Sequence, residues 1–106
     1  MTEIKLEQDS EGKEQLNIYE GDQKVGEMSI KIQPDRLTVY HTLVDPEQQG
    51  KGYAGMLFSF LVDYARKHHL EILPLCAYVR SRFEREPALY KDVWSGGDEG
   101  TDTSIF

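Results

Sequence analysis

The order of apolar and polar residues predicts a series of strands before any helix. Ile4 to Gln8 alternates apolar and polar residues and predicts an edge strand. The runs from Gln15 to Tyr19 and from Lys24 to Ile32 flank a short turn that contains a glycine, which is typical of a β-hairpin. Arg36 to Val44 has Thr, Val and Tyr at favourable positions and predicts a fourth strand. We therefore expect four sequential antiparallel strands.

Alternation also predicts which side chains share a face of the fourth strand. Successive side chains of a strand point to opposite faces of the sheet. Leu37, Val39, His41 and Leu43 are therefore expected on one face, so that His41 lies on a largely apolar surface.

The second half of the chain predicts a helix and then a buried strand. Between about Gly52 and His68, apolar residues recur at helical spacing. Leu70 to Val79 is mostly apolar and predicts a fifth strand, parallel to the fourth because a helical crossover joins the two. Pro74 weakens this strand, because proline removes a hydrogen bond from the ladder.

The C-terminal part predicts short helices and a tail. Arg80 to Glu86 has helix-forming composition and ends at Pro87, and Ala88 to Trp94 can form one or two further turns. The glycine-rich, polar residues 95–106 predict a flexible tail. We expect a single domain over residues 1–94, because a chain of 106 residues has room for one core only.

Composition and charge argue against several classes of protein. The net charge is -7 and the pI is near 4.9, whereas binding to a nucleic-acid backbone depends on clustered Lys and Arg. No apolar run approaches the roughly 20 residues needed to span a bilayer. Cys76 is the single cysteine, which excludes an internal disulfide and fits a reducing compartment. We expect a cytoplasmic protein, a monomer or weak dimer, that binds neither nucleic acid nor membrane.

The segment Gln49-Gly50-Lys51-Gly52-Tyr53-Ala54 is the most informative part of the sequence. Its glycines permit backbone angles closed to other residues and leave no side chain between backbone and ligand. The helix that follows directs unpaired N–H groups and its positive dipole end at the same place. The segment therefore predicts a phosphate-binding loop, although it has neither the Lys-Ser or Lys-Thr of a P-loop nor the third glycine of a dinucleotide fold.

This loop fits the pattern Gln/Arg-x-x-Gly-x-Gly/Ala, with Gln49, Gly52 and Ala54 at the fixed positions. With the preceding run from Thr42 to Gln48, which contains a Val-x-Pro turn, it resembles the acetyl-CoA loop of the GNAT acyltransferase superfamily. The resemblance implies an α+β, or mixed α/β, fold. Its five-stranded sheet would be antiparallel in strands one to four, and strands four and five would be parallel and splay apart. A central helix would bind coenzyme A, and a short C-terminal helix would follow.

The resemblance also implies a cosubstrate and its contacts. The cosubstrate would be acetyl-CoA, with no metal. Backbone groups of Leu43 and Val44 would pair with its pantetheine arm. Its pyrophosphate would lie on the loop residues, which are Gln49, Gly50, Lys51, Gly52, Tyr53 and Ala54.

The chain further resembles a subgroup of very small GNAT proteins, the minimal single-domain YjdJ-like N-acetyltransferases. The runs His41 to Pro46, Gln49 to Ala54 and Cys76 to Val79 carry this resemblance, which extends from about Ile4 to Val93. The initial helical pair that shapes the acceptor site of full-length GNAT enzymes is missing.

His41 and Cys76 are the candidate catalytic residues. By spacing alone His41 is most simply a half-buried sheet histidine satisfied by hydrogen bonds, whereas the resemblance implies a general base, since a neutral imidazole can take the proton of an attacking amine. Cys76 would either accept the acetyl group, with His41 generating its thiolate, or line the acyl slot. A free cysteine can equally be a small buried hydrophobe.

Other polar residues carry weaker predictions. Tyr90 resembles the tyrosine that protonates the departing CoA thiolate in larger GNAT enzymes, but a packing role is the simpler interpretation. The adjacent His68 and His69 form no recognisable metal-ligand pattern. The arginines of the predicted short helix could reach CoA phosphates or form a solvated face, and they are Arg80, Arg82 and Arg85.

The sequence thus predicts an acetyl-CoA-dependent N-acetyltransferase that acts on an unidentified amine acceptor, with or without a cysteine acetyl intermediate. One alternative is a coenzyme A-binding module without transferase activity, which the missing acceptor-site elements favour. Another is a protein-interaction domain that has kept the fold and lost the ligand.

Overall fold

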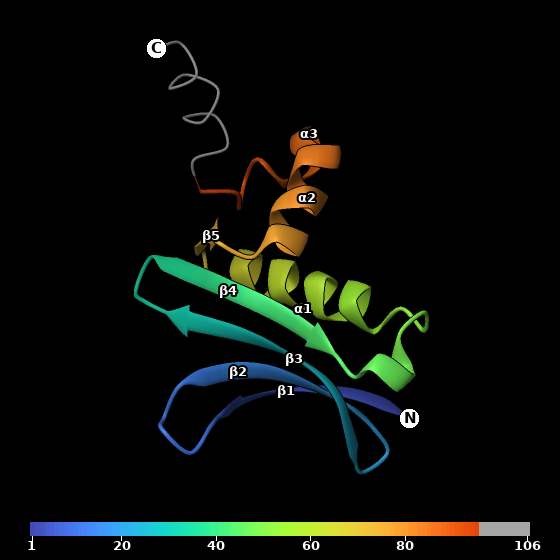
Figure 1. The fold of residues 1–106 in the computed structure, drawn as a ribbon. Helices are drawn as coiled ribbons and strands as arrows, with labels where there is room; N and C mark the ends of the chain where they lie inside the picture. The colour runs from blue at the N-terminus through green and yellow to red at the C-terminus, as the bar shows by residue number, and fades with distance from the viewer. Residues whose placement is uncertain (96–106) are drawn as a thin grey trace.

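The structure is a computed structural model that describes residues 1–95. Its centre is a five-stranded sheet with the strands in chain order (Figure 1). The first four strands pair antiparallel and the fifth is parallel to the fourth, which confirms the predicted fold class. The predicted tail lies, from residue 96 onward, outside the described residues. The strands are β1 Thr2–Gln8, β2 Glu14–Glu20, β3 Gln23–Ile32, β4 Arg36–Val44 and β5 Glu71–Pro74.

Helix α1, Tyr53–Lys67, is the crossover between β4 and β5 (Figure 1). Its ends lie within one residue of the predicted ones, because the apolar spacing that defines it is a local property of the sequence. The shorter helical elements are η1 Pro46–Gln48, α2 Ala77–Arg85 and α3 Pro87–Tyr90.

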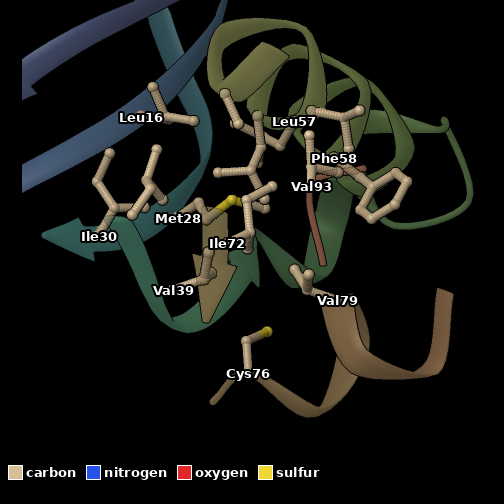
Figure 2. Packing of buried hydrophobic residues seen from close by; sticks show 14 of the residues in the cluster. Leu16, Met28, Ile30, Val39, Leu57, Phe58, Ile72, Cys76, Val79 and Val93 are labelled. Atoms are coloured by element: carbon tan, nitrogen blue, oxygen red, sulfur yellow. The ribbon is translucent and has the colours of Figure 1, made fainter. Parts of the chain in front are cut away.

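The core lies between the sheet and α1 (Figure 2). The apolar side of α1 is buried through Leu57, Phe58 and Leu61, which recur at three- and four-residue spacing and so share one face of the helix. Phe58 extends this layer by edge contacts with rings of α2 and α3. The sheet side of the core includes Leu16, Ile18, Met28, Ile30, Leu37, Val39 and Ile72.

A bulge in the middle of β4 overturns the predicted division of its faces. Ser29 pairs with His41, but the next residue of β3 pairs with Val39, so that Tyr40 is an extra residue. Leu37 and Val39 are buried, whereas His41 is exposed and does not share their apolar face. The prediction was wrong because it assumed strict alternation along the whole strand.

The fifth strand is shorter than predicted. It ends at Pro74, which cannot continue the ladder, and the amides of Leu75 and Cys76 both donate to the carbonyl of Val39 at 3.0 Å. These bonds turn the chain, so that Cys76 is the N-cap of α2 rather than a strand residue. The expected strand residues from Ala77 to Val79 are therefore the first turn of a helix.

Candidate active site

The loop before α1 has the conformation that its glycines permit. Gly50 and Gly52 have φ angles of 87° and 82°, a region that other residues rarely adopt, and open space lies where a Cβ would stand on either of them. Gly52 is the N-cap of α1 and offers no side-chain hydrogen bond to the helix. The first turn of α1 also contains no acidic residue, so no side chain of that turn compensates the positive end of the helix dipole.

The backbone N–H groups of this loop are free of partners within the described chain. From Gly50 to Gly55, no amide donates a hydrogen bond to any residue of 1–95. The first amide of the helix that does so is that of Met56, which donates to the carbonyl of Gly52 at 3.0 Å. Unpaired amides at a helix N-terminus are suited to an anion. The loop therefore fits a phosphate group.

A cavity of about 470 Å³, here called the loop cavity, opens beside these amides. Its volume is in the range of small-molecule sites. Thr42 of β4 and Tyr78 of α2 line it together with Gly55. Of the predicted cofactor residues, Lys51 and Leu43 do not line it. The predicted residues that do are Val44, Gln49, Gly50, Gly52, Tyr53 and Ala54.

Lys51 and Leu43, the two predicted cofactor residues that do not line the loop cavity, lie at exposed positions beside it. The ammonium of Lys51 donates to Gln48 Oε1 at 2.8 Å from an exposed position on the loop. The Leu43 side chain is 56% exposed. Its backbone lies on β4 beyond Val39, the last residue that pairs with β5, so this part of β4 has a free edge on its β5 side. A free edge offers backbone groups to an extended ligand.

Cys76 lies on the helix side of that free edge. Its side chain is 4% exposed, and its Sγ is 3.3 Å from Oγ1 of Thr42. No hydrogen bond joins the thiol to any histidine within residues 1–95. The thiol therefore has a hydroxyl, and no base, as its polar neighbour.

His41 lies on the opposite side of β4. Its Nε2 atom is 3.1 Å from the hydroxyl oxygen of Ser29, and consecutive strand residues point to opposite faces, so His41 and Thr42 face away from each other. His41 lines a second cavity of about 580 Å³, here called the turn cavity, between β3, β4 and the turn that joins β1 to β2. The structure thus does not pair His41 with Cys76, contrary to the expectation that His41 generates the thiolate.

Tyr78 was missed at the sequence level. It lines the loop cavity, and its hydroxyl accepts a hydrogen bond from Arg82 Nη1 at 2.8 Å. The signal was the four-residue spacing of Tyr78 and Arg82, which is meaningful only if the helix begins at Ala77. Tyr90 is 8% exposed and packs against Phe58 and Phe83, as expected of a packing side chain.

Two negative findings apply to residues 1–95. No group of three or more His, Cys, Asp or Glu side chains has an arrangement that could hold a metal ion. In the same part of the chain, no helix combines the length and apolar character needed to cross a bilayer.

The comparison with protein families agrees with this geometry. Residues 15–93 match the model of the GCN5-related N-acetyl-transferase family. The chain belongs to this family. Its members use acetyl-CoA as cosubstrate. The resemblance to the YjdJ-like subgroup is finer than this match and stays a prediction.

A solved structure shares the N-acetyltransferase fold. The chain resembles the ribosomal-protein-alanine N-acetyltransferase from Brucella melitensis biovar Abortus 2308 with a TM-score of 0.65 and 16% sequence identity. The likeness covers 80% of this chain and 90% of that one, and at this identity it supports the fold alone. A search of curated proteins found no match.

Proposed function

We propose that the protein transfers an acetyl group from acetyl-CoA to an amine acceptor, with His41 as general base. The observation that carries the proposal is the row of free amides from Gly50 to Gly55, at the positive end of α1, beside the loop cavity. These groups suit a pyrophosphate in both charge and geometry. The free edge of β4 at Leu43 and Val44 suits the amide-containing pantetheine arm.

In this proposal the loop amides and β4 bind the cosubstrate, and His41 transfers the proton. Bound acetyl-CoA supplies an activated carbonyl. The loop amides and β4 hold it so that this carbonyl lies near the point where β4 and β5 part. His41 lies on the other face of β4, exposed in the turn cavity, where it can take a proton from the amine nitrogen. Ser29 holds the imidazole by its hydrogen bond and so restricts its orientation.

The acceptor would enter through the turn cavity. This cavity lies on the His41 side of the sheet, whereas the loop cavity lies on the Thr42 side. Two openings on opposite faces allow the cosubstrate and the acceptor to bind at the same time, so that transfer needs no intermediate on the protein. The β1–β2 turn would shape the acceptor site, because within residues 1–95 no helical pair precedes the sheet or interrupts its first four strands.

Cys76 is proposed to line the acyl slot. Its burial and its contact with Thr42, in place of a base, support this role over that of a nucleophile. The thiol is also free and buried, which supports a reducing, cytoplasmic location.

The test measures binding and turnover separately. Calorimetric titration with coenzyme A is expected to show binding, and release of free coenzyme A in the presence of amines and peptides is expected to show transfer. His41→Asn should lower kcat by about 100-fold or more while the affinity for coenzyme A is unchanged. His69→Asn is the matched control, because His69 is an exposed histidine whose φ of 57° asparagine accepts.

The alternatives give different results in the same experiment. Tight binding of coenzyme A without transfer to any acceptor would favour a binding module. Absence of binding would favour an interaction domain. Unchanged turnover in His41→Asn would contradict the proposed base.

A further inference from the structure

Arg82 is held on three sides at the start of α1. Its Nη1 donates to the Tyr78 hydroxyl at 2.8 Å, and its guanidinium carbon lies 4.4 Å from the centre of the Phe58 ring. The same Nη1 atom would be 3.7 Å from a Cβ on Gly55. Arg82 therefore contacts α1 at Phe58 and the wall of the loop cavity at Tyr78, and it does not extend into solvent as an isolated helix arginine would.

The charge of Arg82 is not balanced by the chain that surrounds it. Within residues 1–95, no carboxylate forms an ion pair with Arg82. The first turn of α1 contains no acidic residue. The dipole of α1 adds partial positive charge at this N-terminal end of the helix, near Arg82. Within residues 1–95, the electron-rich partners of the guanidinium are therefore the Tyr78 side chain and the Phe58 ring.

The hydrogen bond from Arg82 determines what the Tyr78 hydroxyl can do. A guanidinium only donates hydrogen bonds, so the phenol oxygen must accept here. The phenol has one further hydrogen to donate, and Tyr78 lines the loop cavity with Thr42 and Val44. Residues 1–95 offer this hydrogen no acceptor, because their only hydrogen bond with the hydroxyl is the one that Arg82 donates.

We propose that Tyr78 binds acetyl-CoA by donating a hydrogen bond from its hydroxyl, and that Arg82 is the positioning residue that gives the hydroxyl this orientation. The inference rests on the proposed function, because it takes acetyl-CoA as the ligand of the loop cavity. Arg82 acts through Tyr78. Its hydrogen bond occupies one lone pair of the phenol oxygen, and its position over the Phe58 ring holds the guanidinium in place.

A purely structural role for Tyr78 is the competing interpretation. The ring packs edge-on against Phe58, with centroids 6.4 Å apart and planes at 84°. Tyr78→Phe keeps this ring contact and removes only the hydroxyl. The variant therefore separates a packing role, which it preserves, from a donor role, which it abolishes.

The experiment is a double-mutant cycle on coenzyme A affinity, measured by calorimetry on the full chain. Tyr78→Phe and Arg82→Met are each expected to weaken binding by about fivefold to tenfold, the usual effect of one lost hydrogen bond. The affinity of the double variant for coenzyme A should be within about twofold of that of the single variant that binds less tightly, because Arg82 has no effect once the hydroxyl is gone. Arg82→Lys, which keeps a donor and a charge over the ring, should restore most of the affinity.

Matched controls come from the same helices. Tyr64→Phe removes a hydroxyl near the C-terminal end of α1, and Arg85→Met removes an exposed arginine of α2. Both are expected to bind coenzyme A as the unchanged protein does. If Arg82→Met does not fold, as judged by circular dichroism, the coenzyme A affinities of Tyr78→Phe and Arg82→Lys still test whether the hydroxyl binds the ligand.

The outcomes separate this inference from the proposed function. If the unchanged protein does not bind coenzyme A, both are overturned. If it binds and Tyr78→Phe binds equally well, only the role of Tyr78 is overturned. If the two single effects multiply in the double variant, Arg82 acts on the ligand by itself, and its role as a positioning residue is overturned.

Discussion

Oγ1 of Thr42 lies 3.3 Å from Sγ of Cys76, and this contact assigns the buried thiol to the helix side of β4. His41, the neighbour of Thr42 along the strand, contacts Ser29 on the other side. The backbone of β4 therefore separates the candidate base, His41, from the candidate nucleophile, Cys76. The arrangement suits direct transfer between two bound substrates better than transfer through the cysteine.

Cys76→Ala is expected to retain acetyl transfer. The thiol has no base beside it and serves as a small buried wall, so the cost should be a stability loss of about 1 kcal/mol rather than a loss of turnover. Intact-mass measurement after incubation with acetyl-CoA should show no acetyl adduct on the unchanged protein. An adduct that disappears in Cys76→Ala, together with turnover, would establish the cysteine intermediate instead.

Gly52→Ala is expected to weaken coenzyme A binding by about tenfold or more, because the left-handed backbone that aims the loop amides disfavours a side chain. Gly12→Ala is a close control. Gly12 has a φ of 83° against 82° for Gly52, and a Cβ on either meets open space, so both variants should lose about 1 to 2 kcal/mol of stability. Equal affinities in calorimetric titrations of the two variants would contradict a phosphate contact at the loop.

Glu20 is expected to make stability sensitive to acid. Its carboxylate accepts hydrogen bonds from the amino group of Met1 and the hydroxyls of Thr2 and Tyr53, which lower its pKa from 4.5 to about 2. Because the folded pKa is the lower one, this stabilisation is present above pH 4.5 and is lost as the pH falls toward 2.

Glu20→Gln should therefore reduce the free energy of unfolding at neutral pH and flatten its decline in acid. Denaturant titrations between neutral pH and pH 2 measure both effects. The control is Glu3→Gln, since Glu3 is an exposed carboxylate of β1. A decline as steep in Glu20→Gln as in the unchanged protein would contradict the assignment.

Asp92 and Arg66 are expected to tie the C-terminal segment to α1. The guanidinium donates to both carboxylate oxygens, at 2.9 and 3.2 Å, and to the carbonyl of Leu89 at 2.8 Å. The hydrogen bonds from Arg66 lower the pKa of Asp92, so this stabilisation is present above the ordinary carboxylate pKa and is lost below it.

Asp92→Asn should cost at most about 1 kcal/mol at neutral pH, because the pair is partly exposed and screened by solvent. High salt should reduce the difference from the unchanged protein. Glu11→Gln, which breaks an ion pair exposed on both sides, serves as the control and should change the melting temperature less. An equal shift in the two variants would show that the Arg66 contacts add nothing beyond surface charge.

The sequence by itself determined the features that depend on neighbouring residues. The bounds of β4 follow from a short run of strand-forming residues, and those of α1 from apolar spacing within the helix. The left-handed backbone of the glycine loop was predicted in the same way, because it depends on the two glycines themselves. Each of these signals lies within one short segment, of which the 15 residues of α1 are the longest.

Only the tertiary structure decided how the site is assembled. The extra residue at Tyr40 reverses the alternation of β4 and moves His41 to the exposed face, and it is visible only against the partner strand β3. The end of β5 depends on the Val39 carbonyl, which accepts two amides from a distant part of the chain. Tyr78 lies beside Phe58, a residue of another helix, only because the two helices pack together. Contacts between residues far apart in sequence leave no local pattern, and so they are absent from any reading of composition and spacing.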